Sequence, residues 1–301
     1  MLILALPWLL IVLALLAIVL AWKKKWLYAI TVLIAIIVLN VWSECVSFGS
    51  KNTFKGDIKV FCLNVNGDGE YDEEKVDYIA SLIIKENSDV VFITENFPPL
   101  RDSLTAILHE WYPYDTRYVA HNLFFSKYPL RNQVFYERPN GGSGYIVKAH
   151  ITISGNELCL FGCHLSSNNY SSKLDYLTPD EIDNADKIRS YLTQINYASC
   201  LRELEADTVV SSISESDCAI VMGDMNDICG SVCMRKFNNA GLKDAWSEGG
   251  FGYGATIHTP LPYRIDHILY NEGLVLKGVK VIDTSDISDH NALVAEFDFS
   301  N

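Results

Sequence analysis

The sequence is poor in basic residues. Its 301 residues include 24 Lys and Arg against 37 Asp and Glu, which gives a formal net charge of −13. Five lysines and two acidic residues lie in the first 57 positions, so residues 58–301 carry a charge of −16. Proteins that capture nucleic acid rely on Lys and Arg to neutralise phosphates. The charge therefore disfavours a general binder of nucleic acid, although it does not exclude a nucleic-acid substrate.

The sequence also lacks paired-cysteine motifs. It holds eight cysteines but no C-x-x-C pair. Cys159 with Cys163 and Cys229 with Cys233 are each separated by three intervening residues, and neither pair has a companion histidine pattern. An even number of cysteines permits disulfides, but scattered cysteines within apolar runs are typical of buried free thiols. We therefore expect free thiols and no cysteine-based zinc motif.

Charge is missing from two long runs near the N-terminus, residues 2–21 and 26–42, which are separated by Lys23–Lys25. The first run has the roughly 20 residues that cross a bilayer. It is a poor secretory signal, because no positive charge precedes it and it exceeds the usual apolar stretch of about 7–15 residues. Two buried core helices are the alternative, but Trp residues at the boundaries and the lysine cluster favour membrane helices. We therefore expect residues 1–42 to form a two-helix transmembrane hairpin that binds the lipid bilayer.

The orientation of that hairpin follows from its lysines. The positive-inside rule predicts that the loop Lys23–Lys25 is cytoplasmic and that the following domain is extracytoplasmic, as part of an integral membrane protein. Lys51 and Lys55, after the second run, are a weaker counter-signal. Residues 43–57 are polar and are expected to be a juxtamembrane linker, and residues 58–301 have the size of a single α/β domain. The oligomeric state stays open.

Short apolar runs alternate with helical patterns along residues 58–301. Helical spacing is seen at 72–87 and 183–213. Pairs such as 145–153 and 157–165, joined by a short Ser-Gly-Asn turn, predict hairpins, so the sheets are expected to be mixed. This pattern predicts a layered α/β fold with two packed sheets. The strands are expected at 58–65, 89–94, 123–126, 145–153, 157–165, 218–224, 264–270, 276–283 and 292–299.

Polar side chains stand at or near the ends of most of these strands. In "VMGDMND", Asp224 and Asn226 are two residues apart, so their side chains project to the same face of an extended segment. Taken singly, each such residue is explained by a turn or a cap. Together, their oxygens suit a hard divalent cation, Mg²⁺ or Mn²⁺ rather than zinc, and imply phosphoester hydrolysis. The set is Asn64, Asn66, Glu95, His164, Asp224, Asn226, Asp266, Asp289 and His290.

Seven motifs in order, "LNVNG", "VVFITEN", "NLFFSKYPL", "CHLSS", "GDMND", "RIDHIL" and "SDHNAL", resemble those of the endonuclease/exonuclease/phosphatase superfamily. They spread over essentially all of residues 58–301. The resemblance implies a four-layer α/β/β/α sandwich and a metal-dependent phosphoric ester hydrolase.

The resemblance also implies roles for particular residues. Glu95 would be the main metal carboxylate, supported by Asn64, and Asp289 would lie close to the metal. Asp224 would orient and deprotonate the attacking water, and Asn226 would donate a hydrogen bond to a phosphate oxygen.

Two histidines complete the implied catalytic set. His290, oriented by Asp266, would contact the phosphate or transfer a proton. His164 would stabilise the pentacoordinate transition state or protonate the leaving oxygen. Asn66 stands where the abasic-site endonucleases have an Asp, which weakens any analogy to that branch. The resemblance does not decide which group is the general base.

Three functions remain in competition. The leading hypothesis is a membrane-anchored Mg²⁺-dependent phosphoesterase acting on a phospholipid head group or a small phosphorylated metabolite, because the acidic charge suits such a phosphorylated substrate. The second is a surface nuclease of the deoxyribonuclease type. The third is a catalytically silent tethered binding module, which the complete catalytic set argues against.

Overall fold

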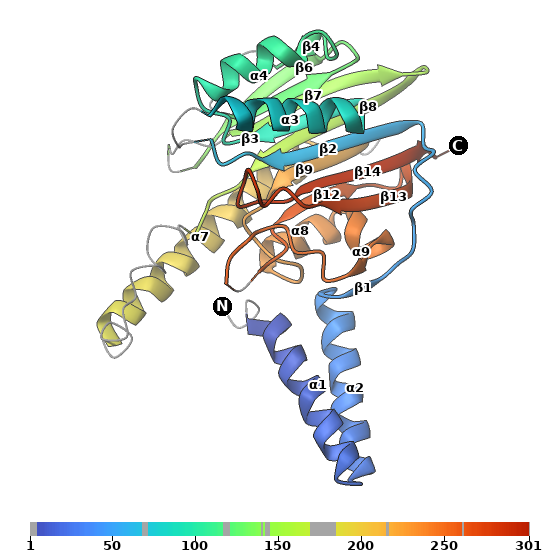
Figure 1. Ribbon diagram of the computed structural model, residues 1–301, viewed down its shortest axis with the longest axis vertical. Coiled ribbons are helices and arrows are strands. Elements are labelled where there is room, and N and C mark those ends of the chain that lie inside the picture. Colours follow the sequence, from blue (N-terminus) through green and yellow to red (C-terminus); the bar gives the residue numbers. More distant parts are fainter. Residues whose placement is uncertain are drawn as a thin grey trace.

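Two six-stranded mixed sheets, stacked face to face between outer helices, form the centre of the described part of the molecule (Figure 1). The structure is a computed structural model that describes residues 5–67, 72–116, 121–139, 141, 145–168, 185–214, 217–260 and 262–300. The first sheet has the order β13 (Leu274–Ile282), β14 (Ala292–Phe299), β2 (Ile58–Asn64), β3 (Val90–Thr94), β5 (Leu123–Ser126) and β4 (Tyr114–Asp115). The second has the order β10 (Lys243–Asp244), β12 (Asp266–Tyr270), β9 (Cys218–Asp224), β8 (Asn156–His164), β7 (Tyr145–Ile153) and β6 (Arg131–Glu137).

One parallel pair lies in the middle of each sheet. Strands β2 and β3 are parallel in the first sheet, and β8 and β9 are parallel in the second, whereas the other pairs are antiparallel. Parallel strands end at the same edge, so the residues that close these strands gather at one side of the sandwich. The core between the sheets is apolar, and it includes Val60, Cys62, Phe92, Phe124, Leu158, Leu160, Ile220, Met222 and Ile268.

The two sheets approach each other most closely where Phe92 of β3 meets two glycines. A Cβ added at Gly162 of β8 would lie 2.0 Å from the Phe92 ring. A Cβ added at Gly223 of β9 would lie 2.2 Å from the Cys163 carbonyl oxygen, and Gly223 has a φ of +127° that other residues rarely adopt. Only glycine therefore fits at either position, next to the ends of β8 and β9.

Helices cover the outer faces of both sheets (Figure 1). Helix α3 (Glu73–Glu86) begins where the Asp72 side chain accepts a hydrogen bond from the Glu74 amide, and ends at Asn87 in the left-handed conformation. With α4 (Leu100–Leu108), it buries its apolar face against the first sheet. Helices α7 (Ala185–Ser211) and α8 (Val232–Asn239) pack on the second sheet. The short α9 (Ala245–Gly249) follows β10.

All nine predicted strands coincide with strands of the structure to within two residues at each end. The predicted helices match α3 and α7, although residues 183–184 lie outside the described part. Strand β6 was not predicted, because most of its residues are exposed and carry no alternating apolar pattern. All eight cysteines are free thiols, as expected.

The N-terminal region corrects the prediction of a transmembrane hairpin. Helix α1 (Leu6–Trp22) has 17 residues and α2 (Trp26–Ser43) has 18. At 1.5 Å per residue they reach about 25 and 27 Å, below the roughly 30 Å of a bilayer core. Within the described residues, no helix has both the length and the apolarity needed to cross a membrane. The expected hairpin, and with it the expected integral membrane location, are therefore wrong; residues 1–4 of the predicted first span lie outside the described part.

The chain after α2 runs along the domain. Strand β1 (Ser47–Phe48) pairs with β11 (Phe251–Gly252), and the Ser47 hydroxyl lies 2.9 Å from the carbonyl oxygens of Ser247 and Gly250. Asn52 forms a β-bridge with Gly278. The residues expected as a juxtamembrane linker therefore pack along α9 and β13.

Candidate active site

Residues that close four strands meet at one edge of the sandwich. Asp224, the last residue of β9, is the register partner of His164 on β8 and of Asp266 on β12. Asn64 ends β2 in the facing sheet, and Glu95 directly follows β3. The parallel pairing of β8 with β9 and of β2 with β3 brings these ends together.

The Asp224 carboxylate is the centre of this cluster. Its Oδ2 accepts a hydrogen bond of 3.1 Å from Asn64 Nδ2, across the two sheets, and its Oδ1 accepts one of 2.8 Å from the Asn226 amide. Burial, the Asp266 charge and the Glu95 charge raise the pKa of Asp224 to about 7, against the opposing effects of His290 and the Asn226 amide. Asp224 therefore exchanges a proton near neutral pH.

His290 is held by a carboxylate on the neighbouring strand. Its Nδ1 lies 2.8 Å from Asp266 Oδ2, and its Nε2 lies 3.9 Å from Asp224 Oδ2. Burial alone would lower the pKa of His290, but the Asp266, Asp224 and Asp289 charges outweigh it and raise the pKa to about 10. His290 is therefore an imidazolium at neutral pH, held in one orientation.

His164 is in the opposite electrostatic situation. Its Nε2 lies 3.4 Å from Glu95 Oε1 and 3.8 Å from Asp224 Oδ2. Burial, followed by the charges of Arg138 and His290, lowers the pKa of His164 to about 3. His164 is therefore neutral, and because both neighbouring atoms are carboxylate oxygens its Nε2 carries the hydrogen.

The donor set fits a hard divalent cation. Glu95, His164 and Asp224 present atoms within 4.8 Å of one another, as do Asp224, Asp266 and His290. The Oδ1 atom of Asp289 is buried and has no hydrogen-bond partner within the described residues. An excess of buried carboxylate with one orphaned oxygen requires a positive charge, and oxygen donors favour Mg²⁺ or Mn²⁺.

Three turns at this edge contain residues in the left-handed conformation. Asn66, Glu95 and Asn226 have φ values of 43°, 54° and 50°. Asn tolerates this conformation well, but for Glu95 it costs on the order of 1 kcal/mol or more. A strained carboxylate at a cluster of this kind is consistent with a functional rather than a structural constraint.

All eight residues predicted for catalysis or metal binding lie in or beside this cluster. Asn226 differs in one respect, because its Nδ2 donates to the Leu165 carbonyl oxygen at 3.0 Å, which leaves one amide hydrogen for a phosphate. Asn66 contributes its backbone amide, which donates to Asn64 Oδ1 at 3.0 Å.

Three supporting residues escaped the sequence analysis. Arg138 Nη2 donates to the carbonyl oxygen of His164 at 2.8 Å, Thr256 Oγ1 accepts from the Asp266 amide at 2.9 Å, and Ser288 Oγ donates to the Asn64 carbonyl oxygen at 2.7 Å. Ser288 is the first residue of the "SDHNAL" motif, so its position was a signal. Arg138 and Thr256 belong to no strand-end pattern, so the sequence held no signal that could have identified them.

Solved structures with the same fold include an endonuclease/exonuclease/phosphatase from Beutenbergia cavernae, with a TM-score of 0.60 and 14% identity over 81% of this chain and 72% of that chain. TDP2 from D. rerio, complexed with a single-strand DNA product, has a TM-score of 0.59 and 17% identity over 80% of this chain and 98% of that chain. Beta toxin from Staphylococcus aureus has a TM-score of 0.53 and 17% identity over 79% and 99%. At such identities the likeness concerns the fold alone.

The comparison with curated proteins gave no significant sequence match. The model of the Endonuclease/Exonuclease/phosphatase family, however, matches residues 39–290, which is most of the chain and includes every residue of the cluster. The chain belongs to the Endonuclease/Exonuclease/phosphatase family.

Proposed function

We propose that the chain is a Mg²⁺-dependent phosphoesterase that cleaves a phosphodiester or phosphomonoester by in-line attack of water. The family match supports the reaction class. The formal charge of −13 supports a small phosphorylated compound or a phospholipid head group over a nucleic acid.

The Asp224 carboxylate carries the proposal. It is fixed from two sides by Asn64 and the Asn226 amide, and burial raises its pKa to about 7. A carboxylate that is fixed in place and has a pKa near neutrality is suited to orient a water molecule and accept its proton. Asp224 is therefore the proposed general base.

The two histidines are proposed to contact different oxygens of the substrate phosphate group. His290, an imidazolium paired with Asp266, donates to a phosphate oxygen and offsets its charge. His164 is neutral and offers its Nε2 hydrogen to an oxygen that gains charge as the phosphorus becomes pentacoordinate. The remaining amide hydrogen of Asn226 orients the same group.

Glu95 and Asp289, with the side-chain oxygen Oδ1 of Asn64, are the proposed metal ligands. A bound Mg²⁺ neutralises charge on the phosphate and stabilises the leaving oxygen. The strained turn at Glu95 and the orphaned Asp289 oxygen support this assignment.

The test is hydrolysis of a chromogenic phosphodiester, a chromogenic phosphomonoester, sphingomyelin and plasmid DNA by the full chain, with and without Mg²⁺. Replacing Asp224→Asn should lower kcat by about 10²–10⁴-fold. Asp298→Asn is the matched control, since Asp298 forms a half-exposed ion pair with Lys277 on β13 and β14, away from the cluster. Equal activity of the Asp224 variant and wild type would overturn the proposal. Absence of both magnesium binding and turnover would favour the silent binding module.

A nuclease is the second candidate, favoured by the fold shared with D. rerio TDP2 in its complex with a single-strand DNA product. It predicts that plasmid or single-stranded DNA is the preferred substrate and that kcat/KM falls steeply with salt, because phosphate contacts release counterions. A phosphoesterase for small substrates predicts a weak dependence on salt.

A further inference from the structure

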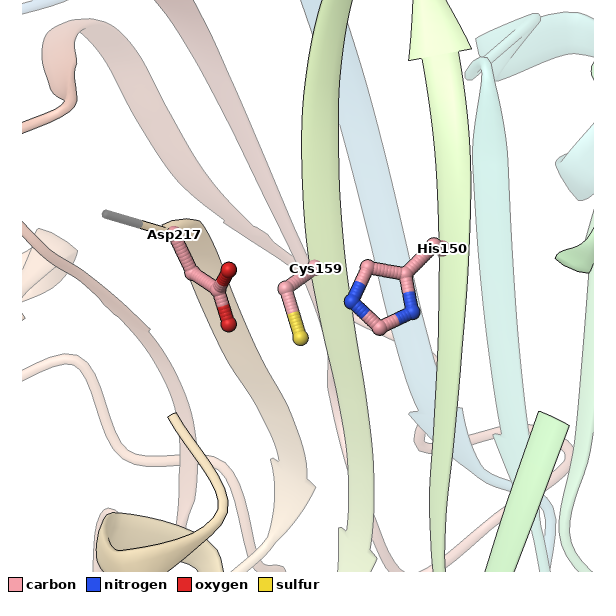
Figure 2. A group of neighbouring side chains, drawn as sticks. All are labelled: His150, Cys159 and Asp217. Carbon is pink, nitrogen blue, oxygen red and sulfur yellow. The ribbon is translucent and has the colours of Figure 1, made fainter. Parts of the chain in front are cut away.

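A second group of potential metal ligands lies on the same sheet, away from the candidate active site. His150 comes from β7, Cys159 from β8, and Asp217 directly precedes β9. One ligand atom of each lies within 4.8 Å of the other two. Figure 2 shows Cys159 between the His150 ring and the Asp217 carboxylate.

The strand register explains why residues so distant in sequence meet. His150 is the direct cross-strand partner of Cys159, and Cys159 is the partner of Ala219, two residues after Asp217. The Cys159 side chain belongs to the outer apolar cluster that α7 covers, whereas Leu158 and Leu160 point into the core between the sheets.

This group is separate from the active site. Cys159 precedes His164 by five residues on an extended strand, so about 17 Å of backbone lies between them. Asp217 and Asp224 are at opposite ends of the neighbouring strand β9 in the same way. The two groups therefore occupy the two ends of one parallel strand pair.

The side chains are already oriented. The Nδ1 atom of His150 is buried and has no hydrogen-bond partner within the described residues. The Ser214 amide donates to Asp217 Oδ2 at 3.0 Å, and Asn271 Nδ2 donates to the Asp217 carbonyl oxygen at 2.6 Å. Figure 2 shows the other ring nitrogen, Nε2, facing Cys159, so Nε2 is the ligand atom that His150 offers to a cation, and the Asp217 carboxylate is held by the Ser214 amide.

The local electrostatics accommodate a cation. Two basic residues lie nearby, and both are engaged elsewhere. The Nζ of Lys148 lies 2.7 Å from the Ser212 carbonyl oxygen and 5.4 Å from the Phe161 ring. Arg131, the cross-strand partner of His150, forms an ion pair of 3.6 Å with Glu157. Burial raises the pKa of the Cys159 thiol to about 12, so the metal-free protein keeps the thiol proton and metal binding must release it.

We propose that His150, Cys159 and Asp217 bind a Zn²⁺ ion, with water in the fourth position. A nitrogen, a sulfur and an oxygen donor are the ligand set of zinc and do not suit Mg²⁺. Bond lengths of about 2.0–2.3 Å require ligand atoms roughly 3.3–3.8 Å apart in a tetrahedron, so the group needs to contract by about 1.5 Å at most. The ion would link β7, β8 and the start of β9 at the end opposite the active site.

Titration of the metal-free full chain with Co²⁺, in excess Mg²⁺, tests the site. Cobalt bound to a thiolate gives a near-ultraviolet charge-transfer band, which the oxygen-rich active site cannot give. We expect one equivalent of Co²⁺ to produce this band, Zn²⁺ to displace it, and Cys159→Ser to abolish it. Cys163→Ser is the matched control, because Cys163 lies on the same strand and the same face and is buried, outside the His150 group.

His150→Gln keeps the thiol and tests the ligand set separately. The Co²⁺ affinity should fall by at least about 100-fold, the upper end of what even the loss of an outer-sphere partner costs. Circular dichroism of each metal-free variant verifies that it is folded. Three results would each overturn the proposal: absence of the band in wild type, survival of the band in Cys159→Ser, or an equal loss of the band in Cys163→Ser. None of these measurements depends on hydrolytic activity.

Discussion

Two buried clusters of Asp and His in this molecule differ in the cation that faces the central carboxylate. In one, Arg264 Nη1 donates to both Asp244 oxygens at 2.8 Å, and His267 Nδ1 lies 2.5 Å from Asp244 Oδ2. The charges of Arg264 and His267 outweigh burial and hold the pKa of Asp244 well below its usual range. In the other, the His290 imidazolium lies 3.9 Å from Asp224, no guanidinium of the described residues donates to Asp224, and the pKa of Asp224 is raised to about 7. Residue type alone therefore does not separate a structural network from a chemical one; a guanidinium that donates to both oxygens of the carboxylate does.

The largest effect should come from removing that guanidinium. Arg264→Met leaves the buried Asp244 carboxylate without its guanidinium, held only by His267 and the Ser247 amide, and should lower the free energy of unfolding by about 3–5 kcal/mol. Urea unfolding measures the change. Arg131→Met, which removes a half-exposed ion pair with Glu157, should cost about 1 kcal/mol or less. Similar losses in the two variants would show that the Arg264 network is not the stabilising one.

Binding of Mg²⁺ at the cluster around Asp224 should stabilise the protein. Mg²⁺ at about 100 times its Kd adds roughly 2.7 kcal/mol to the free energy of unfolding, and EDTA removes it. Glu95→Gln should abolish most of this gain, because it removes the main proposed metal carboxylate. Glu110→Gln, at an exposed position, should keep it. A full magnesium effect in Glu95→Gln would exclude Glu95 as a ligand.

Asp224→Asn should change how stability depends on pH in the absence of metal. A carboxyl whose pKa is raised from 3.8 to about 7 stabilises the protein only while it can hold its proton, so this contribution is present below pH 4 and is lost by about pH 7. The variant should therefore gain stability relative to wild type as the pH rises through that window, by about 4 kcal/mol. Unfolding in EDTA from pH 4 to 8 measures the difference, and a constant difference would contradict the raised pKa.

Asp266→Asn should move the alkaline limit of catalysis. The Asp266 charge is the largest influence that raises the pKa of His290, against burial, to about 10. Without that charge, His290 should lose its proton at lower pH, and the alkaline limb of the kcat/KM profile should shift toward neutrality by at least about one unit. If the alkaline limb of the kcat/KM profile of Asp266→Asn stays where it is in wild type, His290 does not act in its charged form.

Much of this molecule could be predicted from its sequence for identifiable reasons. Strand β9 is a nearly continuous apolar run, and β7 is an apolar run interrupted by Lys148 and His150. The candidate active site consists largely of residues at the ends of such runs. Residues that meet only through the tertiary register could not be found that way. His150, Cys159 and Asp217 lie 9 and 58 positions apart along the chain and match no spacing motif. Arg138 contacts His164 by reaching across from the end of β6.

The error at the N-terminus has a different cause. The prediction rested on the length of the uncharged segment, residues 2–21. The length of a helix depends instead on where the backbone leaves the helical conformation. Helix α2 begins at Trp26, after Lys24 adopts a positive φ of 56°, and it ends at Ser43 before a left-handed Glu44. These breaks limit the two helices to 17 and 18 residues.

The contact of Phe92 with Gly162 and Gly223 constrains the active site. At Gly162 and Gly223, β8 and β9 carry no side chains, so the Phe92 ring of the facing sheet packs directly against their backbone. Asp224 follows Gly223, and its 3.1 Å hydrogen bond with Asn64 joins the same two sheets. A side chain at either glycine would therefore push against the ring and disturb the hydrogen bond that fixes Asp224.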